Sequence, residues 1–166
     1  LSKMGIAPSD TLILYDDKAE CDAARLWWIL KFYGHENMKL LNGGMKAWRA
    51  IDTLLTEEIP SFLPSEYAFQ TLNDSSIYIS HKRLISKLLD TSTVLIDVRG
   101  VDEYSGTMLK NGAASAGHIP KAINLDWAEA VDYNGDHKFL SASELKRKYD
   151  AIGITGDRPV VSYCHS

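Results

Sequence analysis

Cys164 stands directly after a short apolar run, residues 159–163, where a buried strand is expected. A second run of this kind, residues 94–98, contains Asp97 and precedes Arg99. Ligands bind at the carboxyl ends of strands in open parallel sheets. A cysteine followed there by a loop and a helix N-terminus has its thiolate stabilised by backbone N–H groups. The indicated chemistry is nucleophilic attack by sulfur, and the alternative is a small buried thiol without a chemical role.

Other polar residues have structural explanations. Asp97 and Arg99 are candidates for supporting the site, but an ion pair that anchors the strand end is the favoured interpretation. His118 has the chemistry of an acid or base, yet in a Gly-His-Ile-Pro segment it is expected to fix a turn through hydrogen bonds. His35 has the same interpretation. Cys21 is expected to be a helix-surface or half-buried thiol.

Composition and charge narrow the classes of function. The chain has 166 residues, of which 45% are hydrophobic, and a net charge of -4 without a basic run, so nucleic-acid binding is not expected. Its apolar runs are too short to cross a membrane. Two cysteines without metal-ligand spacing, and the isolated acidic pair Asp16 and Asp17, predict no metal site and no cofactor. Few cysteines favour a reducing compartment, so a cytoplasmic protein is expected.

The elements that must position these residues alternate along the chain. Strands are expected at residues 11–15, 38–41, 94–98, 122–125 and 159–163, and helices at 19–33, 45–51, 81–89 and 144–152. Ser80 is a suitable N-cap for the third helix, and residues 105–118 are expected to form a surface loop. Residues 52–79 have no sustained period and predict an extended linker, with one strand near 67–71. Strands alternating with helices predict an α/β fold with a parallel sheet.

Two segments near the ends of the chain are similar. MGIAPSDTLILYD, residues 4–16, aligns without gaps with IGITGDRPVVSYC, residues 152–164. Identical residues stand at three aligned positions, Gly5/Gly153, Ile6/Ile154 and Tyr15/Tyr163. The alignment indicates an internal repeat. Asp16 then stands where Cys164 stands in the other copy, so one copy is expected to be catalytic and the other structural.

Four segments in this order resemble the rhodanese family, specifically its tandem-domain sulfurtransferases. LILYDD with AARLWWILKFYGHENMKLLNGGMKAW resembles the end of the non-catalytic first domain, and VLIDVRGVDEYSG the opening strand of the second. AGHIPKAINLDW resembles the Gly-His-Ile-Pro-Gly-Ala segment of the family, and VVSYCHS the start of its catalytic loop. The resemblance implies a three-layer αβα fold with a parallel sheet and two tandem domains, both incomplete here. Residues 1–51 would end the first domain, 52–79 would link the two, and 80–166 would begin the second.

The resemblance also implies a reaction. Cys164 would take the outer sulfur of thiosulfate as a persulfide and pass it to cyanide or a thiol acceptor. His165 and Ser166 would be the first residues of the substrate-binding loop, and Asp97 and Arg99 would support it. The expected partners are a small-molecule sulfur donor, a thiophilic acceptor and the remainder of the tandem protein.

Three alternatives stay open. Some tandem enzymes carry a substrate-binding arginine where Glu103 aligns, and 3-mercaptopyruvate sulfurtransferases often carry serine at the position of Ser166. The donor could therefore be 3-mercaptopyruvate. A protein phosphatase is a second alternative, which the tandem layout argues against. A non-catalytic rhodanese-like binding module is the third.

Overall fold

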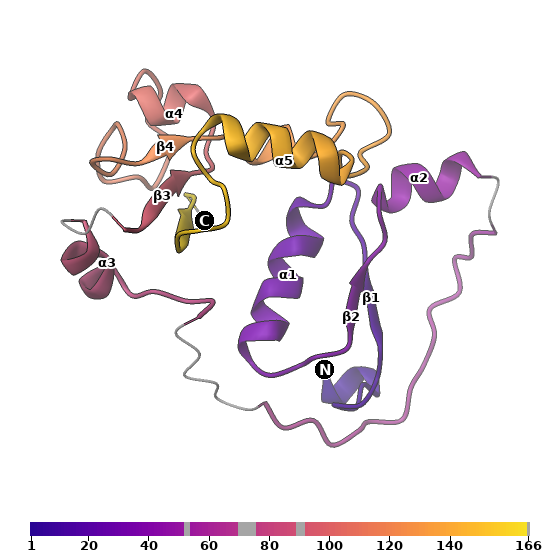
Figure 1. The fold of residues 1–166 in the computed structure, drawn as a ribbon. Coiled ribbons are helices and arrows are strands. Elements are labelled where there is room, and N and C mark those ends of the chain that lie inside the picture. Colours follow the sequence, from indigo (N-terminus) through magenta and orange to yellow (C-terminus); the bar gives the residue numbers. More distant parts are fainter. Residues whose placement is uncertain (52–53, 70–75, 89–91, 166) are drawn as a thin grey trace. The chain divides into compact units, whose positions relative to one another are not determined.

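The computed structural model describes residues 1–51, 54–69, 76–88 and 92–165 (Figure 1). The chain divides into two compact units, Leu1–Tyr78 with Tyr133–Phe139, and Ile79–Asp132 with Leu140–Ser166. Each unit contains helices and a sheet whose paired strands run parallel. The predicted α/β class with a parallel sheet is therefore confirmed.

The first unit is built around a strand–helix–strand crossover. Its elements are the 3-10 helix η1 (Ser2–Met4), β1 (Leu12–Leu14), α1 (Cys21–Phe32), β2 (Met38–Leu40) and α2 (Gly44–Ala50). Strands β1 and β2 pair with Leu12 opposite Met38 and Leu14 opposite Leu40. Helix α1 runs beside both strands and buries Ala23 and Leu30 (Figure 1). This arrangement is the one that a parallel pair requires, because its strands cannot be joined by a tight hairpin.

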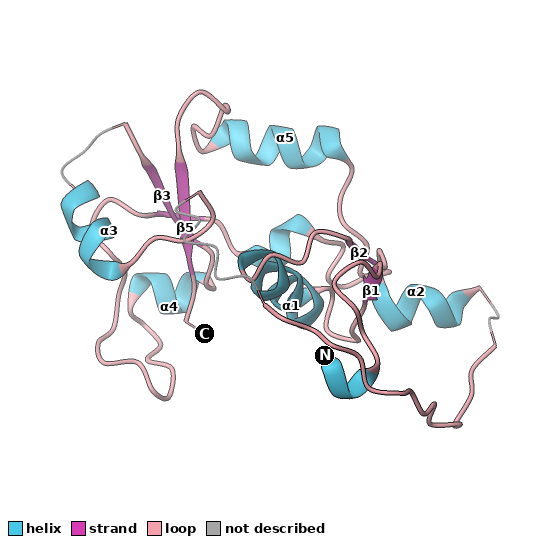
Figure 2. Cartoon of the chain, turned by 90° about the horizontal axis from the view of Figure 1, so that it is seen from below, coloured by secondary structure: helices cyan, strands magenta, loops and turns pink. Residues whose placement is uncertain are grey.

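The second unit holds a three-stranded parallel sheet in the order β4-β3-β5. Its elements are α3 (His81–Lys87), β3 (Val94–Asp97), α4 (Val101–Ser105), β4 (Ile123–Asn124), the 3-10 helix η2 (Trp127–Ala130), α5 (Ala142–Ala151) and β5 (Val160–Tyr163). All four residues of the central strand β3 are buried, as expected for a parallel strand covered on both faces. Figure 2 shows β3 beside β5. The register places Asp97 opposite both Tyr163 and Asn124, so the carboxyl ends of three strands meet at one edge.

Local sequence signals explain the helix boundaries of this unit. The Ser80 hydroxyl accepts a hydrogen bond from Arg83 N at 3.4 Å and begins α3 where predicted. Ser141 and Glu144 form a capping box at the start of α5, two residues before the expected helix start. Gly153 follows α5 with a φ of 80°, a left-handed conformation that glycine adopts without strain.

The structure differs from the expected elements at residues 67–69, at helix α4 and at strand β4. Residues 67–69 form no strand: Tyr67 and Phe69 alternate because their rings pack against each other and against His35 and Tyr33. The remaining residues of that prediction, 70–71, lie outside the described residues. Helix α4 was not predicted, because one turn between two glycines carries no readable period. Strand β4 is shorter than expected. Among the described residues, no helix combines the length and the apolar character needed to span a membrane.

Candidate active site

A cleft of about 350 Å³ lies in the second unit at the carboxyl end of β5. Three parts of the chain line it, namely residues 112, 113 and 115–119 of the loop after α4, the strand end at Tyr163, Cys164 and His165, and the side of Arg99. The cleft therefore opens where the sequence predicts a ligand site, beyond the carboxyl ends of parallel strands.

Cys164 is an exposed residue with a thiol, not a disulfide, and it lines this cleft. This exposure distinguishes it from the small buried thiol that was the alternative interpretation. His165 lines the same cleft, and Ser166 lies outside the described residues. Cys21 is also exposed, at the start of α1, as expected for a helix-surface thiol.

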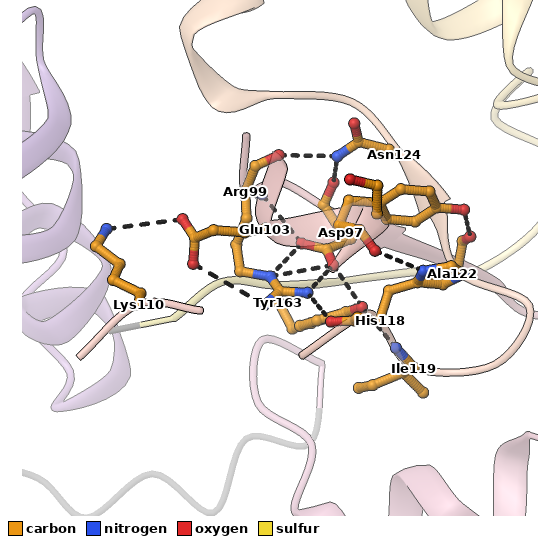
Figure 3. A network of polar contacts seen from close by, with 12 residues as sticks. Asp97, Arg99, Glu103, Lys110, His118, Ile119, Ala122, Asn124 and Tyr163 are labelled. Carbon is orange, nitrogen blue, oxygen red and sulfur yellow. Dashed lines mark hydrogen bonds and ion pairs between the residues drawn. The ribbon is translucent and has the colours of Figure 1, made fainter. Parts of the chain in front are cut away.

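Asp97 and Arg99 form the ion pair that the sequence favours. The Asp97 carboxylate is fully buried and accepts hydrogen bonds from Arg99 Nε at 2.9 Å and from Arg99 Nη2 at 2.6 Å (Figure 3). Burial raises the pKa of Asp97, but hydrogen bonds from Arg99 and Tyr163 outweigh it and hold the pKa below its usual value. The hydrogen bond with Asp97 raises the pKa of Arg99. Both side chains are therefore charged at neutral pH. Arg99 anchors the strand end and also lines the cleft.

Tyr163 is the site residue that sequence reasoning missed. Its hydroxyl donates a hydrogen bond to Asp97 Oδ2 at 2.7 Å and accepts one from Ile119 N at 3.0 Å (Figure 3). Burial, followed by the hydrogen bond to Asp97, raises the pKa of Tyr163 to about 12, so the hydroxyl stays protonated at neutral pH. The available signal was the position of Tyr163 at the end of a strand expected to pair with the strand that contains Asp97.

The loop that lines the cleft is anchored where it returns toward the sheet. Arg99 Nη2 donates a hydrogen bond to the carbonyl of Gly117 at 2.8 Å. His118 Nδ1 lies 2.8 Å from the carbonyl of Tyr104, and the two rings stack at 3.7 Å between centroids. The predicted turn-fixing role of His118 is therefore confirmed. His35 behaves alike in the first unit, where Nε2 lies 3.0 Å from the carbonyl of Asp10.

Glu103 adds a second buried carboxylate beside Arg99. It is 8% exposed, and its oxygens lie 3.9 Å from Arg99 Nη1 and 3.7 Å from Lys110 Nζ (Figure 3). Asp97 and Glu103 thus supply two negative charges near the two positive charges of Arg99 and Lys110. The charge of Arg99 is therefore largely compensated by its neighbours.

Asp16 occupies the corresponding place in the first unit, after β1. Its carboxylate accepts hydrogen bonds from three backbone N–H groups, those of Lys18 at 2.9 Å, Glu20 at 3.0 Å and Ala23 at 2.8 Å. Burial raises the pKa of Asp16, but these backbone hydrogen bonds outweigh it and lower the pKa overall. A cluster of at least three His, Cys, Asp or Glu side chains suited to a metal ion is absent from the described residues. The Asp16 carboxylate thus accepts the hydrogen bonds of backbone N–H groups at and before the start of α1.

Comparisons with known proteins place this geometry in a family. The Rhodanese-like domain family matches residues 1–51 and 80–166. The "Sulfur carrier protein TtuD" of Thermus thermophilus is 37% identical over 99% of this chain and 60% of its own length. The "Thiosulfate sulfurtransferase" of Corynebacterium glutamicum is 32% identical over 99% of this chain and 56% of its own length. The chain thus spans little more than half the length of these relatives.

A solved structure has the same fold. The anaerobic ergothioneine biosynthesis enzyme from Chlorobium limicola, in complex with trimethyl histidine, superposes with a TM-score of 0.82 and 25% identity. The match covers 99% of this chain and 44% of that enzyme. With parallel strands, a cleft at their carboxyl ends and the family match over most of its length, the chain belongs to the rhodanese-like domain family.

Proposed function

We propose that the protein containing this chain is a sulfurtransferase that carries sulfur as a persulfide on Cys164. The observation that carries this proposal is the position of the exposed residue Cys164 in the cleft at the end of β5. Relatives named as a sulfur carrier protein and as a thiosulfate sulfurtransferase support it. Residues 80–166 would form the first part of the catalytic domain and residues 1–51 the last part of a non-catalytic one, joined by 52–79.

The proposed reaction has two displacement steps. The Cys164 thiolate attacks the outer sulfur of thiosulfate, forming the Cys164 S–S bond while the S–S bond of thiosulfate breaks and its electron pair leaves with sulfite. Cyanide or a thiolate then attacks the outer sulfur of the persulfide and releases the Cys164 thiolate. Neither step needs an external oxidant, reductant or cofactor. His165 and Ser166 would begin the loop that holds the donor, and Arg99 would line its binding side.

The test is the intact mass of the full protein, as the organism makes it, after incubation with thiosulfate under non-reducing conditions. We expect a gain of one sulfur atom that maps to Cys164 and is removed by cyanide. Cys164→Ser should lose the gain, whereas the matched control Cys21→Ser should keep it. Sulfur uptake that persists in Cys164→Ser, or its absence from the wild type, would overturn the proposal.

The same assay distinguishes the alternative donor. Both thiosulfate and 3-mercaptopyruvate would leave the same persulfide on Cys164, but the first releases sulfite and the second pyruvate. We expect thiosulfate to be the better donor, in line with the name of the Corynebacterium relative. Faster persulfide formation with 3-mercaptopyruvate would identify that compound as the substrate instead.

A further inference from the structure

Tyr163 immediately precedes Cys164 and is held at both its backbone and its side chain by the end of β3. Its carbonyl accepts a hydrogen bond from Val98 N at 3.0 Å, and its hydroxyl donates to Asp97 Oδ2 at 2.7 Å. The Arg99 guanidinium lies over the Tyr163 ring, 5.7 Å from its centroid. The last residue of the central strand, Asp97, and the residue after it, Val98, therefore fix the conformation of the chain directly before Cys164.

The same hydroxyl also contacts the loop that lines the cleft. It accepts a hydrogen bond from Ile119 N at 3.0 Å, in the loop whose residues line the cleft together with Cys164. A phenolic hydroxyl can donate to a carboxylate and accept from an amide at once, which neither phenylalanine nor a tyrosinate can do. The raised pKa of Tyr163, about 12, keeps this dual role intact at working pH.

We propose that the Tyr163 hydroxyl is the positioning group of the site: it sets the distance and orientation between Cys164 and the loop at residues 112–119 by joining Asp97 to Ile119. The inference rests on the proposed sulfur transfer at Cys164. Tyr163 touches neither donor nor acceptor in this role and acts through the geometry of its neighbours. Nucleophilic displacement at sulfur is sensitive to such geometry, because a misplacement of about 1 Å costs roughly a hundredfold in rate.

Tyr163→Phe removes this hydroxyl and keeps the ring. We expect kcat for sulfur transfer from thiosulfate to cyanide in the full protein to fall about tenfold to a hundredfold, with KM within about twofold. The donor-binding side chains are unchanged, which is why KM should hold. Hydrogen–deuterium exchange of residues 112–119 should accelerate, because Ile119 N loses its acceptor. Tyr67→Phe is the matched control: it removes a hydroxyl that lies 2.6 Å from His35 Nδ1 in the first unit. This control should leave kcat and the exchange of 112–119 unchanged.

The two readouts separate the failure of this inference from that of the proposed function. A wild type that takes up no sulfur overturns the proposed function, and exchange then still reports whether Tyr163 holds the loop. Unchanged exchange of residues 112–119 in Tyr163→Phe overturns the inference. An active variant with kcat within about twofold of wild type does the same. An equal loss of kcat in Tyr67→Phe would show that loss of either hydroxyl lowers kcat through general destabilisation, and would also overturn the inference.

Discussion

Asp97 shows how one buried side chain organises the candidate site. It collects hydrogen bonds from the backbone N–H and guanidinium of Arg99 and from the hydroxyl of Tyr163, all within 3.1 Å. The Asn124 side-chain amide donates to the carbonyls of Asp97 and Arg99, at 3.0 and 2.8 Å, which fixes the backbone that carries the pair. The ion pair thus stabilises the end of β3, and both of its members contact Tyr163.

Asp97→Asn should be strongly destabilising. The substitution keeps the shape but removes the carboxylate that contacts the Arg99 guanidinium at 2.6 Å and leaves only Glu103 at 3.9 Å. Breaking a buried ion pair costs about 3–5 kcal/mol. Chemical denaturation followed by circular dichroism measures the loss. Asp150→Asn is the control, because its partner Lys146 makes an exposed pair on α5 and exposed pairs contribute little. Equal stability of the two variants would contradict this account of Asp97.

The residues also show what the sequence could and could not reveal about the site. Cys164 and the pair Asp97–Arg99 follow apolar runs, which is a local pattern. The dual hydrogen bond of Tyr163 joins residues 44 and 66 positions apart in sequence, and no local pattern encodes such a contact. Residues that position a catalytic group through distant partners therefore need the structure.

Among the elements, α5 has a capping box at its start and leads into β5, the strand that ends directly before Cys164. Ser141 Oγ accepts a hydrogen bond from Glu144 N at 3.3 Å, and the Glu144 carboxylate accepts one from Ser141 N at 3.0 Å. The chain then passes from α5 through Gly153 into β5. A secure start of α5 thus contributes to the stability of the unit that contains the cleft.

Ser141→Ala should lower the free energy of unfolding by about 1 kcal/mol, the usual cost of losing an N-cap side chain. Thermal unfolding followed by circular dichroism at 222 nm, a wavelength that reports helix, provides the measurement. Ser143→Ala serves as its control, because the Ser143 hydroxyl contacts the Ser141 hydroxyl, at 3.1 Å, rather than a backbone N–H of the first turn. A loss in Ser143→Ala as large as that in Ser141→Ala would show that the cap is not the cause.

Strong local signals located most elements, and weak ones failed for physical reasons. The apolar run at 94–98 became the buried strand β3, and Ser80 marked the start of α3. The prediction of a strand near residues 67–71 is wrong for Tyr67 and Phe69, because their rings alternate to pack against His35 and Tyr33 in the turn after α1. A period of two in an aromatic segment therefore does not by itself predict a strand.

At the scale of the whole molecule, each unit places a carboxylate with a lowered pKa after a parallel strand or at its end. Asp16 in the first unit and Asp97 in the second hold their charge through hydrogen bonds. Both folded-state pKa values lie below the unfolded value of about 3.9. Each group therefore stabilises the fold above about pH 4, and that contribution is lost as pH falls through the folded-state value.

We expect the melting temperature to fall as the pH is lowered below about 4, with both units affected. Glu20 makes the opposite contribution to this pH dependence. Burial raises its pKa, so protonation of Glu20 on acidification removes an unfavourable buried charge and offsets part of the loss of stability. Differential scanning calorimetry from pH 7 downward measures the sum. In Asp97→Asn the dependence should become shallower. A melting temperature that is constant from pH 7 to pH 2 would contradict the role assigned to the two aspartates.

The Asp16 carboxylate also has a consequence in time. Under the proposed chemistry, the negative charge at Cys164 moves from the thiolate sulfur to the outer sulfur of the persulfide and back, so the position of this charge changes with each turnover. Asp16 carries its charge permanently at neutral pH and keeps three amide groups occupied. The loop after β1 is therefore held by the same hydrogen bonds whether or not Cys164 carries sulfur. In an experiment that follows backbone changes around Cys164 during turnover, the amides bonded to Asp16 should stay unchanged and serve as the control within the same molecule.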